Sequence, residues 1–176
     1  MKVLVTYYSG TGNTEKVAKA IKEGIKGHEV DLLNIKGADP NSIGTYDLVF
    51  IGSGLFAFNI SRKLPTFLKK IPSLPPKFAY FYTHEAPQKG AYPNCFKSVN
   101  TIIEKSNCEV LGTFDCCGEN LVEKAQEQRE AMMNRLSPEE RQKSEEAWLN
   151  LVKGHPNAQD LENAKSFAAS IINKFP

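Results

Sequence analysis

A run of small hydroxyl and glycine residues near the start of the chain has the composition of a phosphate-binding loop. It follows an apolar segment at residues 3–8 and precedes a helical pattern at residues 15–21. A strand ending in such a loop points the backbone N–H groups of the next helix at one spot, with the positive end of the helix dipole behind them. The sequence therefore predicts a phosphate site that needs no cationic side chain. The loop consists of Ser9, Gly10, Thr11, Gly12, Asn13 and Thr14.

Two common phosphate-binding patterns do not fit this loop. The nucleotide triphosphate loop requires a Lys directly after its last glycine, but Asn13 follows Gly12. The dinucleotide pattern requires a third glycine where Glu15 stands. Residues 8–15, Tyr-Ser-Gly-Thr-Gly-Asn-Thr-Glu, instead resemble the phosphate loop of flavodoxins, which are small FMN proteins. An ordinary turn that caps a helix is the alternative interpretation.

The overall composition is that of a single soluble globular domain. The chain has 176 residues, 41% of them hydrophobic and 24% charged, which is enough to bury a core. No apolar stretch is long enough for a membrane helix, and no signal-peptide pattern is present, so we expect a cytoplasmic protein without a membrane partner. The net charge of +2 is too small and too evenly spread to predict nucleic-acid binding.

The four cysteines do not form a recognisable site. Cys95, Cys108, Cys116 and Cys117 are too few and too irregularly spaced for a disulfide scaffold or a zinc site. We expect thiols in a reducing compartment and no bound metal. A redox-active pair at the adjacent Cys116 and Cys117 is the alternative, although neighbouring cysteines form a strained bridge.

Apolar runs alternate with helical patterns along the chain and predict an α/β fold. We expect strands at residues 3–8, 28–33, 46–52, 77–83 and 109–114, and a final helix that begins at Asn157. Strands separated by helices form a parallel sheet with right-handed crossovers and helices on both faces. The resemblance implies a flavodoxin-like doubly wound five-stranded sheet in the order 2-1-3-4-5, with its ligand at the carboxyl ends of the strands.

A polar helical segment at about residues 119–153 interrupts this alternation after the fifth strand. Its first half carries Leu121 and Met132 at helical spacing, and Ser137-Pro138-Glu139-Glu140 has the pattern of a capping box that opens a second helix. We expect two amphipathic helices that pack on the single domain 1–176 as an insertion. A partner-binding surface is the alternative.

Two further loops are expected beside the phosphate loop because they follow the third and fourth strands. Phe56 and Phe58 lie in a glycine-containing loop with no obvious core to join, and such rings can stack on a flat ligand. The resemblance implies that Phe56 and Tyr92 cover the two faces of the flavin ring; burial of both phenylalanines beneath the insertion is the alternative. The first loop contributes Ser53, Gly54, Leu55, Phe56, Ala57 and Phe58, and the second Thr83, His84, Glu85 and Tyr92.

Within the second loop, His84 and Glu85 permit two interpretations. Adjacent residues do not easily share one metal or acid–base site, so we favour a role for the loop backbone. The resemblance implies that the N–H groups of Thr83 and Glu85 orient the polar edge of the flavin.

The resemblance spans most of the chain and implies an FMN-dependent electron carrier between redox partner proteins, as a monomer or weak dimer. Three departures stand out: the chain is not acidic, it carries the insertion, and Ala57-Phe58 replaces a glycine-containing step. The weak charge puts docking on the usual basic partners in doubt. An FMN-dependent NAD(P)H or quinone oxidoreductase is the second hypothesis, and a flavin-free interaction module is the third.

Overall fold

Five parallel strands form the centre of the molecule. In the computed structural model, which describes residues 1–86 and 90–175, the strands are β1 (Lys2–Tyr8), β2 (Glu29–Asn34), β3 (Leu48–Phe56), β5 (Lys77–His84) and β6 (Glu109–Cys117). Their order is β2-β1-β3-β5-β6, and the two-residue strand β4 (Asn59–Ile60) pairs antiparallel with β3. The predicted doubly wound parallel sheet is confirmed, and its order is the expected 2-1-3-4-5 when β4 is not counted.

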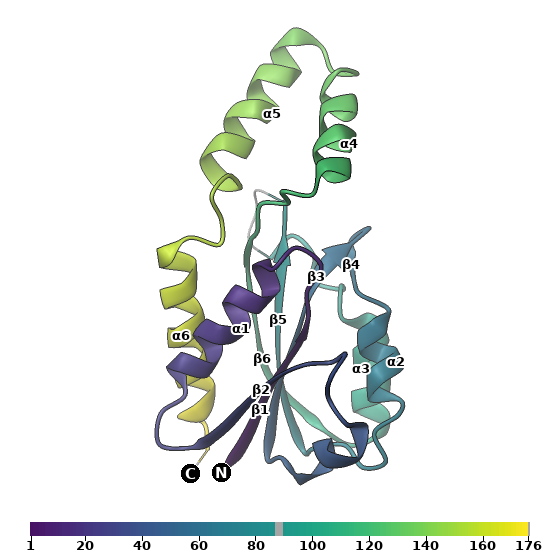
Figure 1. Ribbon diagram of the computed structural model, residues 1–176, viewed down its shortest axis with the longest axis vertical. Helices are drawn as coiled ribbons and strands as arrows, with labels where there is room; N and C mark the ends of the chain where they lie inside the picture. The colour runs from purple at the N-terminus through teal and green to yellow at the C-terminus, as the bar shows by residue number, and fades with distance from the viewer. Residues whose placement is uncertain (87–89, 176) are drawn as a thin grey trace.

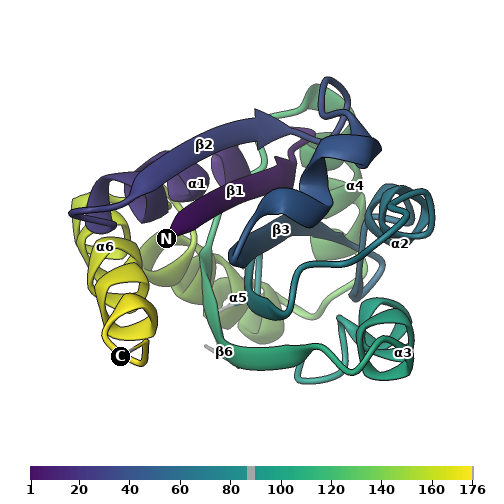
Figure 2. The same cartoon turned by 90° about the horizontal axis from the view of Figure 1, so that it is seen from below.

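Helices cover both faces of the sheet (Figures 1 and 2). The helices are α1 (Asn13–Gly24), the 3₁₀ helix η1 (Pro40–Thr45), α2 (Lys63–Leu68), α3 (Lys97–Lys105), α4 (Glu123–Met133), α5 (Pro138–Leu151) and α6 (Ala158–Ile172). One core lies between the sheet and α1 with α6, and the other lies between the sheet and α2 with α3. In β1, Val3 and Val5 belong to the first core and Leu4 to the second, because successive side chains of a strand point to opposite faces.

Local sequence signals fix the ends of the later helices. Ser137 accepts a hydrogen bond from the Glu140 N–H, and the Glu140 side chain accepts one from the Ser137 N–H, so the predicted capping box at α5 is confirmed. Asn157 and Asp160 form the same arrangement at the start of α6. Among residues 1–86 and 90–175, no helix has both the length and the apolar character needed to cross a bilayer.

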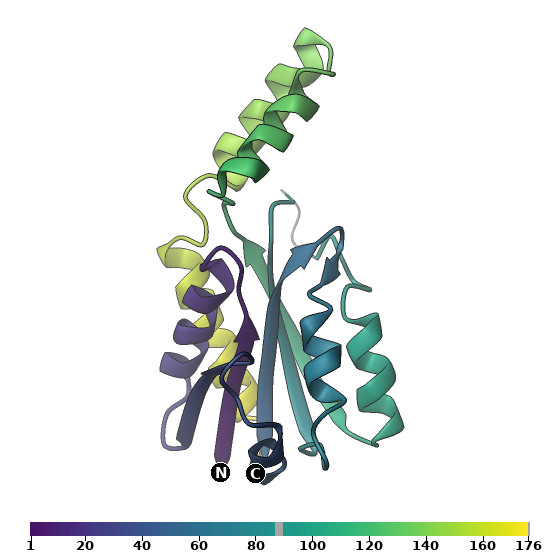
Figure 3. The ribbon, with the colours of Figure 1, turned by 45° about the vertical axis from the view of Figure 1, so that its right-hand side comes forward.

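The insertion differs from our expectation that its helices pack on the domain. Helices α4 and α5 form a hairpin that projects beyond the carboxyl edge of the sheet (Figures 1 and 3). The reason is their polar surface: α5 has no buried residue within it, and Met133 is the buried residue of α4. The hairpin is held internally by Arg129, whose guanidinium lies 3.9 Å from the centre of the Trp148 ring.

Short hydrogen bonds attach the base of this hairpin to the domain. The Asn13 side-chain amide donates to the Glu119 carbonyl at 2.7 Å, and the Asn120 N–H donates to Glu85 Oε1 at 3.2 Å. The two connections of the hairpin are also joined, because the Glu119 N–H donates to the His155 carbonyl at 2.7 Å. The hairpin is therefore anchored at the loops that follow β1 and β5.

The cysteines lie in or next to the sheet and the α3 region. Cys116 and Cys117 end β6 and are not bridged to each other. Their side chains point to opposite faces of the strand, and the Cys117 thiol donates to the Ala86 carbonyl at 3.0 Å. This alternation argues against the redox-active vicinal pair considered from the sequence.

Candidate functional site

The loop after β1 is shaped to receive an anion. Helix α1 begins at Asn13, and its N-cap residue Gly12 has φ of 90°, a left-handed conformation that glycine adopts without strain. In the described part of the chain no side chain caps the first turn of α1, so its N–H groups are available to a ligand. Ser9 Oγ accepts a hydrogen bond from the Gly12 N–H at 3.0 Å and so holds the loop in shape.

The register of the sheet brings the three predicted loops to one edge. Tyr8 of β1 pairs with Ser53 of β3, and Gly54 of β3 pairs with Thr83 of β5. The loops that follow these residues therefore start side by side. The part of the second loop at residues 87–89 lies outside the described residues.

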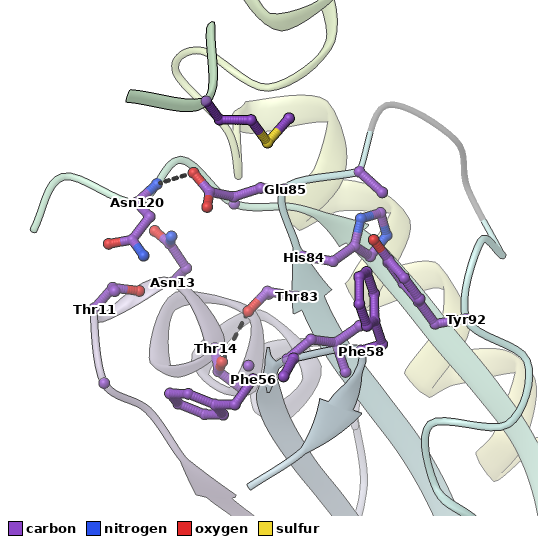
Figure 4. A pocket seen from close by; sticks show the side chains of 17 residues that line it. Thr11, Asn13, Thr14, Phe56, Phe58, Thr83, His84, Glu85, Tyr92 and Asn120 are labelled. Atoms are coloured by element: carbon purple, nitrogen blue, oxygen red, sulfur yellow. Dashed lines mark hydrogen bonds between the residues drawn. The ribbon is translucent and has the colours of Figure 1, made fainter. Parts of the chain in front are cut away.

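A cavity of about 460 Å³ opens between these loops (Figure 4), within the size range of cofactor sites. Of the sixteen predicted site residues, all but Ser9, Gly12 and Ser53 line it. Ser53 lies behind the wall, where its buried hydroxyl donates to the Gly54 carbonyl at 2.6 Å and accepts from the Ser61 N–H at 3.0 Å. The thirteen residues are Gly10, Thr11, Asn13, Thr14, Gly54, Leu55, Phe56, Ala57, Phe58, Thr83, His84, Glu85 and Tyr92.

Two threonine hydroxyls meet in the wall of the cavity. Thr14 Oγ1 in the first turn of α1 lies 2.9 Å from Thr83 Oγ1 near the end of β5, and both residues are buried. Figure 4 shows this pair between the phosphate loop and the aromatic residues. Each hydroxyl has one hydrogen, so when one is donated within the pair the other remains for a ligand.

The phenylalanines at the end of β3 and in the turn that follows it are exposed, so the alternative that both are buried beneath the insertion is wrong. The side chains of Phe56 and Phe58 are 50% and 71% exposed. The Phe56 ring lies 6.0 Å from the Tyr8 ring, and a Cβ placed on Gly10 would lie 3.6 Å from Phe56 Cζ. Phe56 therefore lies against the phosphate loop.

On the other side of the cavity, Phe58 lies beside Tyr92, with ring centres 5.8 Å apart (Figure 4). Strand β3 runs to Phe56, whereas we expected the strand to end at residue 52 and a loop to follow. A two-residue turn then joins β3 to β4, with φ of 48° at Ala57 and 68° at Phe58. Positive φ at both central residues suits the right-handed twist of a hairpin and is strained for side chains larger than glycine.

His84 and Glu85 have separate partners and do not form one site. The buried His84 Nε2 lies 3.1 Å from Asp115 Oδ2, which also accepts from the Gly90 N–H at 2.7 Å. His84 Nδ1 has no hydrogen-bond partner among the described residues. Glu85 instead accepts from the Asn120 N–H, and burial raises the pKa of its carboxyl. Within the described part of the chain, no three His, Cys, Asp or Glu residues are grouped as metal ligands.

Four lining residues were missed from the sequence: Ala86, Gly118, Asn120 and Met132. Three of them belong to the insertion or its first connection. Gly118 lies so close to the phosphate loop that a Cβ there would be 2.9 Å from Asn13 Nδ2. The apolar spacing that identified Met132 indicated a helix face, but nothing in the spacing indicated that this face turns towards the cavity.

Comparisons with known proteins agree with this architecture. Residues 4–169 match the family model of the flavodoxin domain. BilS, a flavodoxin-like domain-containing protein of Clostridioides difficile, is 33% identical over 187 residues, covering 99% of this chain and 98% of that protein. An uncharacterized protein of Methanocaldococcus jannaschii is 30% identical over 174 residues, covering 98% of this chain and 99% of that protein. The solved structure of a flavodoxin from the domain Archaea has a TM-score of 0.64 at 16% sequence identity, and the match covers 99% of this chain and 98% of that one.

Proposed function

The chain belongs to the flavodoxin domain family, and from this premise we propose that it binds FMN and carries electrons between redox partner proteins. The observation that carries the proposal is the uncapped start of α1, which faces a cavity of cofactor size with exposed aromatic rings at its rim. A phosphate fits the first of these features and a flat apolar ring fits the second. A cytoplasmic location and a monomeric or weakly dimeric state remain predictions.

The phosphate end of the cofactor would be held by the loop after β1. The N–H groups of the first turn of α1 supply donors, and the hydroxyls of Thr11 and Thr14 line the same cavity. Among the described residues, no Lys or Arg lines the cavity, so we assign the favourable electrostatics to the helix dipole and the backbone. The Asn13 side chain gives one N–H to Glu119 and thereby ties the loop to the hairpin.

The ring end would be bound by the residues after β3 and β5. Bound FMN supplies one- and two-electron chemistry, and the protein supplies binding, orientation and electrostatics. Phe56 and Tyr92 would cover the ring and exclude water from it, and we assign the N–H groups of Thr83 and Glu85, which line the same cavity, to its polar edge. Apolar cover and the Glu85 carboxylate both disfavour added negative charge, which lowers the reduction potential.

A direct test compares FMN with riboflavin, which lacks the phosphate. We expect the purified protein to be yellow, and its apo form to quench the fluorescence of added FMN with an affinity well over tenfold higher than for riboflavin, because several N–H donors would face a charged group. Replacing Phe56 or Tyr92 by Ala should weaken FMN binding and restore flavin fluorescence. Equal affinities for the two flavins would contradict the phosphate assignment.

A second assay distinguishes a carrier from an enzyme. The holoprotein is mixed with NADH or NADPH and a quinone, and oxidation of the nicotinamide is followed in the steady state. The proposed carrier shows no turnover, whereas sustained turnover would favour the NAD(P)H or quinone oxidoreductase. An apo protein that takes up no flavin at all would favour an interaction module.

A further inference from the structure

A groove beside α2 is lined by several cationic side chains, and no Asp or Glu is among its described lining residues. It has a volume of about 320 Å³, and its charged lining residues are Lys36, Arg62, Lys63 and Lys70. The other lining residues are uncharged, and within the described chain none of the four cations forms an ion pair with a carboxylate. Four unpaired charges in one groove form a local field much stronger than the net charge of +2 indicates.

The groove adjoins the candidate flavin site through Tyr8. The Lys63 ammonium donates to the Tyr8 hydroxyl at 3.0 Å and lies 4.4 Å from the centre of its ring, while Lys36 lies 5.7 Å from the same ring. Tyr8 directly precedes the phosphate loop, and its ring lies 6.0 Å from Phe56, which is half exposed at the rim of the cavity. Figure 3 shows α2 beneath the β3–β4 hairpin, and Phe56 is the last residue of β3 in this hairpin. A molecule seated in the groove would therefore reach the edge of the cavity.

The length of the groove indicates a protein surface as its occupant. The cations extend from the start of α2 at Arg62 to Lys70 beyond its end, and a six-residue helix alone is about 9 Å long. Positive charges spread over such a distance can pair with several carboxylates on a protein surface, whereas a single phosphate is too compact to reach all of them. Long, flexible Lys and Arg side chains at the rim of a protein–protein interface raise the association rate and orient the partner through complementary charge.

We propose that this groove docks an acidic face of the redox partner protein, with the partner's redox centre held against the Phe56 side of the cavity. The inference rests on the proposed electron-carrier function and adds the charge and place of the partner contact. Electrostatic steering of this kind raises association rates by about 10- to 1,000-fold and weakens as salt screens the charges.

The test uses the FMN-loaded protein and two matched variants. Arg62→Glu/Lys70→Glu reverses two charges of the groove, and Lys22→Glu/Lys26→Glu reverses two exposed charges at α1, on the opposite face of the sheet. Both change the net charge from +2 to −2. The probe is a reduced plant-type [2Fe–2S] ferredoxin, a strongly acidic protein. Its cluster gives one electron to the bound flavin, and the second-order rate is measured by stopped flow at low and high salt.

We expect the groove variant to react at least tenfold more slowly than the wild type at low salt, with the α1 variant within about twofold. The difference should vanish near 1 M salt, where the Debye length is about 3 Å. Equal rates for wild type and groove variant, or equal slowing in both variants, would overturn the proposal.

Two controls separate this inference from its premise. Both variants should bind FMN as the wild type does, and a wild type that binds no FMN would refute the proposed function before docking is measured. Titration with inorganic pyrophosphate tests for a small-anion site. If the groove variant loses pyrophosphate binding but keeps the wild-type ferredoxin rate, the groove binds a small anion and the docking proposal is wrong.

Discussion

Replacing the threonine pair in the cavity wall by valine separates a structural hydrogen bond from a ligand contact. Thr14 and Thr83 are 1% and 5% exposed, and their hydroxyl oxygens lie 2.9 Å apart. Valine keeps the shape of threonine, so Thr14→Val or Thr83→Val leaves the other hydroxyl buried without its partner. Such a group costs about 1–3 kcal/mol, whereas removal of both partners is nearly neutral.

A double-mutant cycle on the free energy of unfolding of the apo protein therefore measures the coupling between the two hydroxyls. We expect each single variant to lose about 1–3 kcal/mol and the double variant to lose far less than the sum, so that the interaction energy is about 2–3 kcal/mol. Urea unfolding monitored by circular dichroism measures all four proteins. Additive losses would show that the two hydroxyls do not interact in the folded protein.

Flavin affinities of the same proteins test the second role of Thr14. If its hydroxyl also donates to the phosphate, Thr14→Val lowers FMN affinity by about tenfold to a hundredfold, since a bond to a charged group contributes roughly 1.5–3 kcal/mol. Riboflavin affinity should stay unchanged. Thr83→Val should lower stability but keep the ratio of FMN to riboflavin affinity. An unchanged ratio in Thr14→Val would refute the hydroxyl–phosphate contact.

Two other predictions concern the backbone and the thiols. Ala57→Gly should raise the free energy of unfolding by about 0.5 kcal/mol, because relief of strain at φ of 48° outweighs the added flexibility of the unfolded chain; urea unfolding that shows a less stable variant would contradict this. Burial raises the pKa of Cys95 and of Cys117 to about 11 from a usual value of 9. The two protonated thiols therefore contribute fully to the stability of the folded protein below pH 9, and this contribution is lost as pH rises towards 11. The free energy of unfolding of Cys95→Ser/Cys117→Ser, measured by urea unfolding, should therefore fall less over this pH range than that of the wild type.

The centre of the fold was predictable because its strands are apolar on both faces. The ends of the strands could not be predicted in this way. Strand β6 continues to Cys117, beyond the predicted residue 114, because Asp115, Cys116 and Cys117 pair with residues of β5. This pairing depends on a neighbouring strand and leaves no hydrophobic pattern in the sequence.

The site was predictable where it follows from topology and not where it depends on distant contacts. The residues at and beyond the carboxyl ends of β1, β3 and β5 meet because parallel strands end at one edge. Asn120 and Met132 reach the same cavity only through the direction of the hairpin, which is fixed by contacts such as Asn13 to Glu119, 106 residues apart. The cations of the groove are spread over residues 36–70 and meet only in the folded chain.

The place of the single tryptophan determines what the intrinsic fluorescence of this protein reports. Trp148 is the one tryptophan in the sequence, and it lies on the projecting hairpin beneath the Arg129 guanidinium. Its indole emission therefore monitors α4 and α5, while far-ultraviolet dichroism averages over the whole backbone. Melting curves from the two signals coincide only if the hairpin and the sheet unfold as one cooperative unit. Any separation between the curves measures how independently the hairpin moves from the domain to which it is anchored.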